Sequence, residues 1–187
     1  MSHGDPSSAD EVLEAYFAAK DGNRPRLAER AFDADATLEV RNRSEAIDFP
    51  AITRGAGAIA DVLVRQFGRT YDDVHSFYLA RPAGDATSFS CGWLVGMTAK
   101  DDGAVRVGAG RYDWTLEPRP WRATRLVITI EAMQVLPALE APAVYAWLEQ
   151  LAYPWSTARA AIDAAPLIDA LVPVLDHLSA HSKATSR

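Results

Sequence analysis

The chain has 187 residues, of which 49% are hydrophobic and 24% charged, and its net charge is -6. This composition is typical of a globular protein with a sizeable core and excludes collagen-like, disordered and membrane-embedded classes. The acidic balance disfavours nucleic acid as a partner, because phosphate binding needs a clustered basic surface. No apolar run approaches the ~20 residues of a membrane span, so no membrane partner is expected. A single cysteine, Cys91, and a polar start unlike a signal peptide indicate a cytoplasmic protein.

The first part of the chain predicts helices around one strand. Residues 8–20 carry polar capping residues followed by an apolar stripe at helical spacing. Pro25 begins a second short helix, and a turn at 33–35 leads into a strand over 36–41. The segment 42–52 is either a loop that covers a pocket or a short strand, and 55–67 predicts a third helix.

The central part predicts a four-stranded antiparallel meander. Strands are expected over 72–81, over 86–99, and within 104–135 on either side of a turn at 117–120. The last two strands form the pair around which the fold is organised, because they alternate strictly with period two. Gly108, Gly110, Tyr112 and Trp114 share one face, which we expect to point toward the helices, while Arg111 and Asp113 point away. Glycine leaves space where a sheet bends or a ligand approaches.

The last fifty or so residues change to a helical pattern. Residues 142–153 predict an amphipathic helix, and Ser156 caps a second helical region that runs to about residue 177. Pro166 and Pro173 are expected to interrupt that region, and 180–187 form a polar tail. The sequence therefore predicts an α+β cone over residues 1–136 and a C-terminal helical extension over 137–187.

The outer face of the sheet is expected to be apolar. Val105, Val107, Val127 and Cys91 are assigned to that face, and a monomer would not normally expose such an area. Either a second subunit or the C-terminal helices must cover it. The sequence predicts a homodimer on this ground.

The order of elements resembles the NTF2-like superfamily, in particular its SnoaL-like branch. The resemblance is carried by the runs 15–19 and 32–39, the glycine-led helix, the meander, and the hairpin over 110–122. It covers about residues 8–136 and implies a curved antiparallel sheet with helices across its concave face, enclosing an apolar pocket. The family includes ketosteroid isomerase, scytalone dehydratase, polyketide cyclases and limonene epoxide hydrolase, together with non-catalytic binding modules. Membership alone therefore fixes no reaction.

The resemblance also implies roles for individual residues. Tyr16 matches the tyrosine that donates to the oxyanion in the isomerase, and Tyr112 falls where that enzyme has a protonated aspartic acid. Val40 stands where the isomerase has its base. His75 resembles the catalytic histidine of the dehydratase, whose Tyr–Asp pair and second histidine have no counterpart here.

Each of these residues also has a structural interpretation. Tyr16 and Tyr112 are either pocket donors or core tyrosines whose hydroxyls reach solvent or a carbonyl. His75 is either a general base or a structural histidine at a strand start. Asp48 is the carboxylate best placed to reach the pocket, or a solvated loop residue. His177 and His181 have metal-pair spacing without a third ligand, and no metal is expected.

Two functions remain open at this point. The first is a cofactor-independent isomerase, dehydratase, cyclase or lyase that transfers a proton on a hydrophobic, oxygen-bearing molecule of polyketide, terpenoid or aromatic type. Tyr16 and Tyr112 would hold the oxygen, and His75 or Asp48 would move the proton. The second is a non-catalytic small-molecule-binding or dimerisation module, which the apolar Val40 favours. In both cases the pocket is expected to be lined by Val40, Phe49, Phe67, Gly110 and Trp114.

Overall fold

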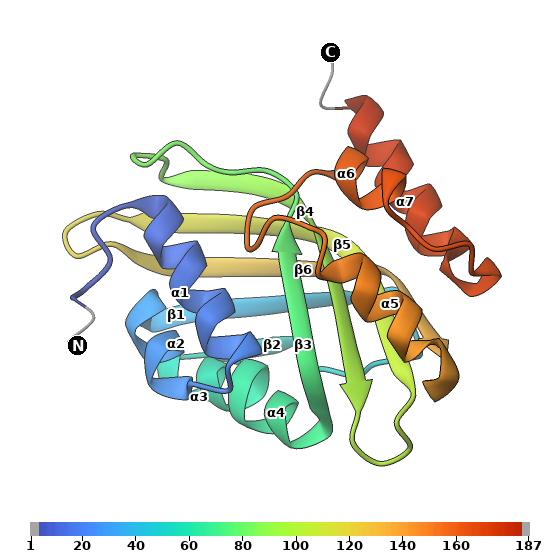
Figure 1. Cartoon of the computed structure of the whole chain (residues 1–187). Coiled ribbons are helices and arrows are strands. Elements are labelled where there is room, and N and C mark those ends of the chain that lie inside the picture. The colour runs from blue at the N-terminus through green and yellow to red at the C-terminus, as the bar shows by residue number, and fades with distance from the viewer. Residues whose placement is uncertain (1–3, 185–187) are drawn as a thin grey trace.

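The computed structural model of the chain describes residues 4–184. A six-stranded sheet lies between two groups of helices, with α1 to α4 on its concave side and α5 to α7 on its convex side (Figure 1). The α+β cone predicted from the sequence is the observed architecture.

The N-terminal helices cover the concave face of the sheet. They are α1 (Ala9–Asp21), α2 (Pro25–Ala31), α3 (Ala56–Ala60), the π-helical segment η1 (Asp61–Gln66) and α4 (Phe67–Thr70). Pro25 begins α2 as predicted, because its missing N–H has no partner to lose in a first turn. The single helix predicted over 55–67 is divided into α3, η1 and α4.

The sheet has the order β2-β1-β6-β5-β4-β3. Its strands are β1 (Phe32–Asn42), β2 (Ile52–Arg54), β3 (Tyr71–Tyr78), β4 (Ser88–Ala99), β5 (Val105–Glu117) and β6 (Arg122–Leu136). Strands β3 to β6 form the predicted antiparallel meander, and β1 pairs with β6 in parallel. The predicted turn at 33–35 lies inside β1, where the pairing with β6 shifts.

Strand β5 has the predicted phase. Tyr112 and Trp114 are buried in the concave-side core, whereas Arg111 is exposed on the other face. The expectation that the glycines open space is wrong, however, because neighbouring side chains fill it. A Cβ atom added at Gly108 would lie 2.4 Å from the Cε of a methionine on β6. One added at Gly110 would lie 1.9 Å from a backbone carbonyl oxygen of β6.

The C-terminal residues form η2 (Ala138–Glu140), α5 (Ala141–Leu148), α6 (Ala158–Asp163), η3 (Asp169–Leu171) and α7 (Val172–Ala184). Helix α5 is shorter than predicted. The N-cap of α6 is Thr157, whose hydroxyl accepts from Ala160 N at 3.1 Å, and not Ser156. The predicted interruption occurs at Pro166, which lies between α6 and η3, whereas Pro173 is the second residue of α7. Residues 185–187 of the predicted tail lie outside the described part of the chain. Between residues 4 and 184 no helix combines the length and apolarity needed to cross a membrane.

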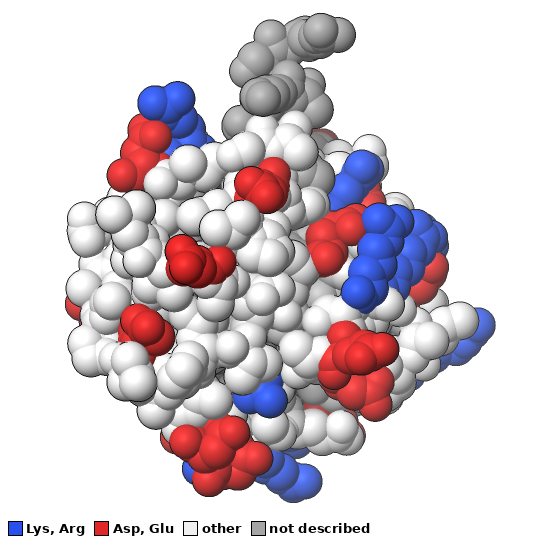
Figure 2. All heavy atoms as spheres, turned by 90° about the vertical axis from the view of Figure 1, so that its right-hand side faces the viewer, with Lys and Arg blue, Asp and Glu red and all other residues white. Residues whose placement is uncertain are grey.

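Helices α5 to α7 cover part of the convex face and share an apolar core with it. Val105 and Val107 lie in this core, together with Trp147 and Leu148 of α5. Cys91 was assigned to this face wrongly: it is in phase with Trp93 and belongs to the concave-side core. Figure 2 looks onto the side that carries these helices, where single acidic side chains stand on a largely uncharged surface.

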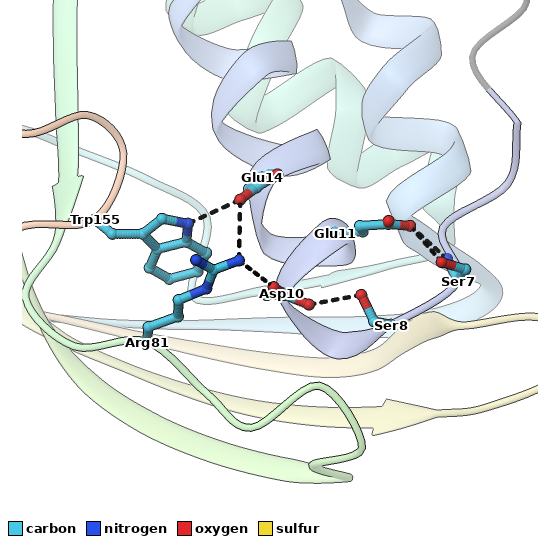
Figure 3. A network of polar contacts seen from close by, with 7 residues as sticks. All are labelled: Ser7, Ser8, Asp10, Glu11, Glu14, Arg81 and Trp155. Carbon is cyan, nitrogen blue, oxygen red and sulfur yellow. Dashed lines mark hydrogen bonds and ion pairs between the residues drawn. The ribbon is translucent and has the colours of Figure 1, made fainter.

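Residues 153–156, the connection between α5 and α6, run beside β3. The amide of Tyr78 donates to Pro154 O, and the amide of Ser156 donates to Tyr78 O, both at 2.8 Å. Trp155 stacks on Tyr78 and donates its indole N–H to Glu14 of α1 at 2.8 Å. Figure 3 shows this contact inside a polar network that extends to the N-terminus of α1. The C-terminal extension is therefore joined to the helical side of the cone.

Candidate functional site

An apolar cavity of about 40 Å³ lies between the concave face of the sheet and the N-terminal helices. We call it the concave-face cavity. Its lining is aromatic and aliphatic except for one ammonium group, and consists of Tyr16, Lys20, Val40, Ile47, Phe49, Leu63, Phe67, Trp93, Val95, Met97, Tyr112, Ile128, Ile130 and Met133.

A second cavity of about 280 Å³ lies next to the first. Ile47, Phe49 and Phe67 line both cavities and so form the wall between them. The concave-face cavity by itself has room for only a few water-sized groups. A larger ligand needs these three side chains to move apart.

Lys20 is the charged residue of the concave-face cavity, and the sequence analysis gave it no role. It lies at the end of α1, four residues after Tyr16 and hence on the same buried face of the helix. Its side chain is 6% exposed. The Nζ donates to Ser76 Oγ, lies 3.3 Å from Asp21 Oδ1 and stands 4.9 Å from the centre of the Phe67 ring.

Asp21 links Lys20 to two other parts of the chain. Its carboxylate accepts from the amide of Ser76 at 2.9 Å and from the Ser76 hydroxyl at 2.7 Å. Burial first, and then the Asp21 charge and a hydrogen bond to it, raise the pKa of Tyr153. Tyr153 of the extension is therefore close enough to Asp21 for that charge to act on it.

Two opposing effects set the proton affinity of Lys20. Burial lowers the pKa of Lys20 below its ordinary value of 10.5, because the apolar surroundings solvate an ammonium poorly. The charge of Asp21 and a hydrogen bond to it act in the opposite direction but do not cancel the effect of burial. Lys20 therefore loses its proton more readily than an exposed lysine does.

Tyr16 and Tyr112 converge as the sequence analysis expected. Their ring centres are 6.2 Å apart in an edge-to-face arrangement, and each side chain influences the pKa of the other. Burial raises the pKa of both tyrosines, so both phenols are neutral at ordinary pH.

Two indole groups near the cavity have unused donors. Trp93 lines the cavity, and among the described residues its buried Nε1 has no acceptor. Trp114, which packs against Tyr16, has the same property. A buried donor without an acceptor is costly, and a ligand oxygen beside Trp93 would remove that cost.

The five predicted lining residues divide into two groups. Val40, Phe49 and Phe67 line the cavity. Gly110 and Trp114 do not, because the Trp93 ring covers Gly110 and because Trp114 is packed between aromatic rings farther along the sheet.

The two predicted proton carriers lie outside the cavity. His75 is on the opposite face of β3 from Ser76, where its ring contacts Tyr145 of α5 at 5.4 Å and Nδ1 lies 2.9 Å from Asp73 O. Strand alternation decides this placement, since neighbouring residues point to opposite faces. Asp48 is exposed and lines the second cavity. Neither residue lines the concave-face cavity.

No group of His, Cys, Asp and Glu side chains among residues 4–180 could hold a metal ion. The thiol of Cys91 is also unsuited to nucleophilic chemistry, because burial raises its pKa to about 12. The polar groups at or beside the cavity that can take part in acid–base or nucleophilic chemistry are Lys20, Asp21, Tyr16 and Tyr112.

Comparison with known proteins identifies the fold. No protein-family model and no curated protein matches the sequence. Among solved structures, a protein with a ketosteroid isomerase-like fold from Catenulispora acidiphila, in complex with trimethylamine, is 20% identical. The match has a TM-score of 0.51 and covers 63% of this chain and 83% of that one.

Two further structures have the same architecture. The LinA structure has a TM-score of 0.54 at 12% identity, with 67% of this chain and 84% of that chain covered. An NTF2-like protein from Burkholderia thailandensis has a TM-score of 0.52 at 13% identity, with 66% and 90% covered. The chain has the NTF2-like, ketosteroid isomerase-like fold.

Proposed function

We propose that this protein binds a small hydrophobic molecule in the concave-face cavity, with an oxygen atom of the ligand directed at Lys20. The observation that carries the proposal is a single buried ammonium in an otherwise apolar, aromatic-lined cavity. Such sites combine apolar walls with few polar groups that fix the orientation of a ligand.

The donors around the cavity support an oxygen-bearing ligand. Lys20 offers an N–H, the Tyr16 and Tyr112 side chains line the cavity, and among the described residues the Trp93 indole lacks an acceptor. Each of these groups can donate a hydrogen bond, so a carbonyl or hydroxyl oxygen suits them. Structures with this fold include a complex with trimethylamine and a hexachlorocyclohexane dehydrochlorinase, which act on or hold small molecules.

The test is ligand-observed NMR with 1-butanol, a short probe chosen because the cavity is small. Binding to the full chain should be seen by saturation transfer and should be lost in Val40→Phe, since the larger side chain fills the cavity. Leu167→Ala is the matched control, because Leu167 is fully exposed in the extension. Equal binding by the wild type and Val40→Phe would contradict the proposal.

Proton transfer on the bound molecule is the second candidate, and Lys20 replaces His75 in it. Lys20 would take the proton from the bound molecule, with Asp21 3.3 Å away to stabilise the ammonium that forms. Tyr16 would donate to an oxygen that gains negative charge, and loss of such a donor typically lowers turnover by ~10²–10³. Solvent deuterium exchange into a bound ketone, present in the wild type and lost in Lys20→Arg, tests this candidate.

A further inference from the structure

We propose that Lys20 acts as an amine nucleophile and forms an imine with small aldehydes or ketones that enter the concave-face cavity. This inference rests on the proposed function, because it needs a carbonyl compound in that cavity. It goes further in naming the ligand class and a covalent bond.

Lys20 lines the concave-face cavity, and its nitrogen has both polar and aromatic neighbours. Its polar contacts are the hydroxyl of Ser76 and the carboxylate of Asp21, and both lie toward β3 and the end of α1. The remaining neighbours are aromatic: the ring centres of Phe67 and Phe17 lie 4.9 Å and 5.7 Å from Nζ. A carbonyl carbon in the cavity would meet the nitrogen on this apolar side.

The nitrogen must be a neutral amine in order to attack. Burial favours the amine over the ammonium, because apolar surroundings solvate a charge poorly. The polar groups that face the nitrogen are the Asp21 carboxylate and the Ser76 hydroxyl on β3. The pKa of Lys20 is lowered in these surroundings.

The reaction balances without any further reactant. The nitrogen lone pair forms a bond to the carbonyl carbon, the C=O π electrons move to oxygen, and a proton from the nitrogen passes to that oxygen to give a carbinolamine. The Asp21 carboxylate then accepts the remaining proton of the nitrogen and passes it to the hydroxyl group. The C–O bond breaks, water leaves, and the nitrogen lone pair forms the C=N bond. The products are one neutral imine and one water.

Reductive trapping tests the proposal. The full chain is incubated at neutral pH with butanal and sodium cyanoborohydride, and the adduct is located by peptide mass mapping. We expect a butyl group on Lys20 in preference to Lys100, whose side chain is 39% exposed and paired with Asp72. Exposed lysines are almost entirely ammonium at this pH and react slowly.

Two variants make the result specific. Lys20→Arg keeps a positive charge beside Asp21 but cannot form an imine, so it should lose the adduct while remaining folded. Lys100→Arg is the matched control and should keep the adduct on Lys20. Circular dichroism of each variant establishes that the fold is retained.

Binding of 1-butanol and of butyrate separates this inference from the proposed function. If 1-butanol binds and butanal leaves Lys20 unmodified, the imine is ruled out while the proposed function stands. Tight binding of butyrate without any adduct overturns the inference too, because Lys20 would then act as a permanent cation. If neither alcohol nor aldehyde binds, both proposals fail.

Discussion

Helices cover both faces of the sheet, but the two apolar cores differ in how fully they are packed and in whether their buried indole donors have acceptors. On the convex side the indole N–H of Trp147 donates to Ala161 O at 2.9 Å, and Leu148 fills the space beside Gly96. On the concave side a cavity remains, and Trp93 and Trp114 have indole donors without acceptors among the described residues.

This difference separates a stabilising core from a candidate binding core. Native interiors are close-packed and satisfy nearly all buried polar groups, and the convex side follows this rule. The concave side departs from it at the place where a lysine is buried. Departures of this kind are expected at functional sites, where stability is given up for interaction with a ligand.

The largest effect is expected on the convex side. Trp147→Ala removes a fully buried ring and its hydrogen bond, and should lower the free energy of unfolding by about 3–5 kcal/mol. Chemical denaturation measures this change. Leu167→Ala in the same extension should leave the free energy unchanged, because its side chain is exposed. A loss below about 1 kcal/mol for Trp147→Ala would mean that the extension is not part of the stabilising core.

Lys20→Met should have the next largest effect. Removal of one partner of a buried pair typically costs about 3–5 kcal/mol, and we expect the lower end because Asp21 keeps two hydrogen bonds from Ser76. The double variant with Asp21→Asn should regain part of the loss in denaturation experiments. A double variant that is less stable than Lys20→Met alone would show that the loss of Lys20 does not leave Asp21 as an uncompensated buried charge.

The pH dependence of stability should carry the signature of Lys20. Between its lowered pKa and the ordinary value of 10.5, the unfolded chain binds a proton at Lys20 that the folded chain does not. The free energy of unfolding should therefore rise with pH in this window, by up to about 1.4 kcal/mol per pH unit. The slope is absent below the lowered pKa. Above about pH 10 the free energy of unfolding should fall. The raised pKa values of Tyr16 and Tyr112 mean that the folded chain keeps protons which the unfolded chain loses.

Comparison of the wild type with Lys20→Met isolates this contribution. The variant should show no rise in the free energy of unfolding over the window that ends at 10.5. Identical slopes for the two proteins would show that Lys20 titrates normally.

The smallest effect is expected at the exposed ion pair of β5. Arg111 and Asp113 are 2.6 Å apart, closer than Lys20 and Asp21, but Arg111 is 50% exposed. Solvent screens such a pair, so Arg111→Ala should change the free energy of unfolding by about 0–1 kcal/mol. A loss as large as that of Lys20→Met would show that distance, and not burial, decides the contribution of an ion pair here.

The candidate site was partly predictable. Tyr16 lies in the apolar stripe of α1 and Tyr112 on the inward face of β5, so their convergence followed from helical and strand periodicity. Lys20 has the same phase as Tyr16 and could have been found by the same reasoning. It was missed because a lysine near a helix C-terminus is ordinarily solvated.

His75 shows why a single strand position is difficult to assign. A shift of one residue transfers a side chain to the other face, and nothing local distinguishes His75 from Ser76 as the inward residue. The contacts that fix Ser76 as the inward residue are made with α1, and those that hold His75 on the other face are made with α5. Both helices are distant from β3 in the sequence.

The sequence by itself determined the elements and the inward face of β5, because helical and strand periodicity and the turn residues act over a few neighbours. The tertiary structure alone decided which inward residues meet. It placed Lys20 against Ser76 on β3, filled the space at Gly108 and Gly110, and brought Tyr153 of the extension to Asp21. These contacts depend on how α1 crosses the sheet and on how the strands pair. Periodicity predicts the face on which a side chain lies, but it does not predict which side chain from a distant element packs against it.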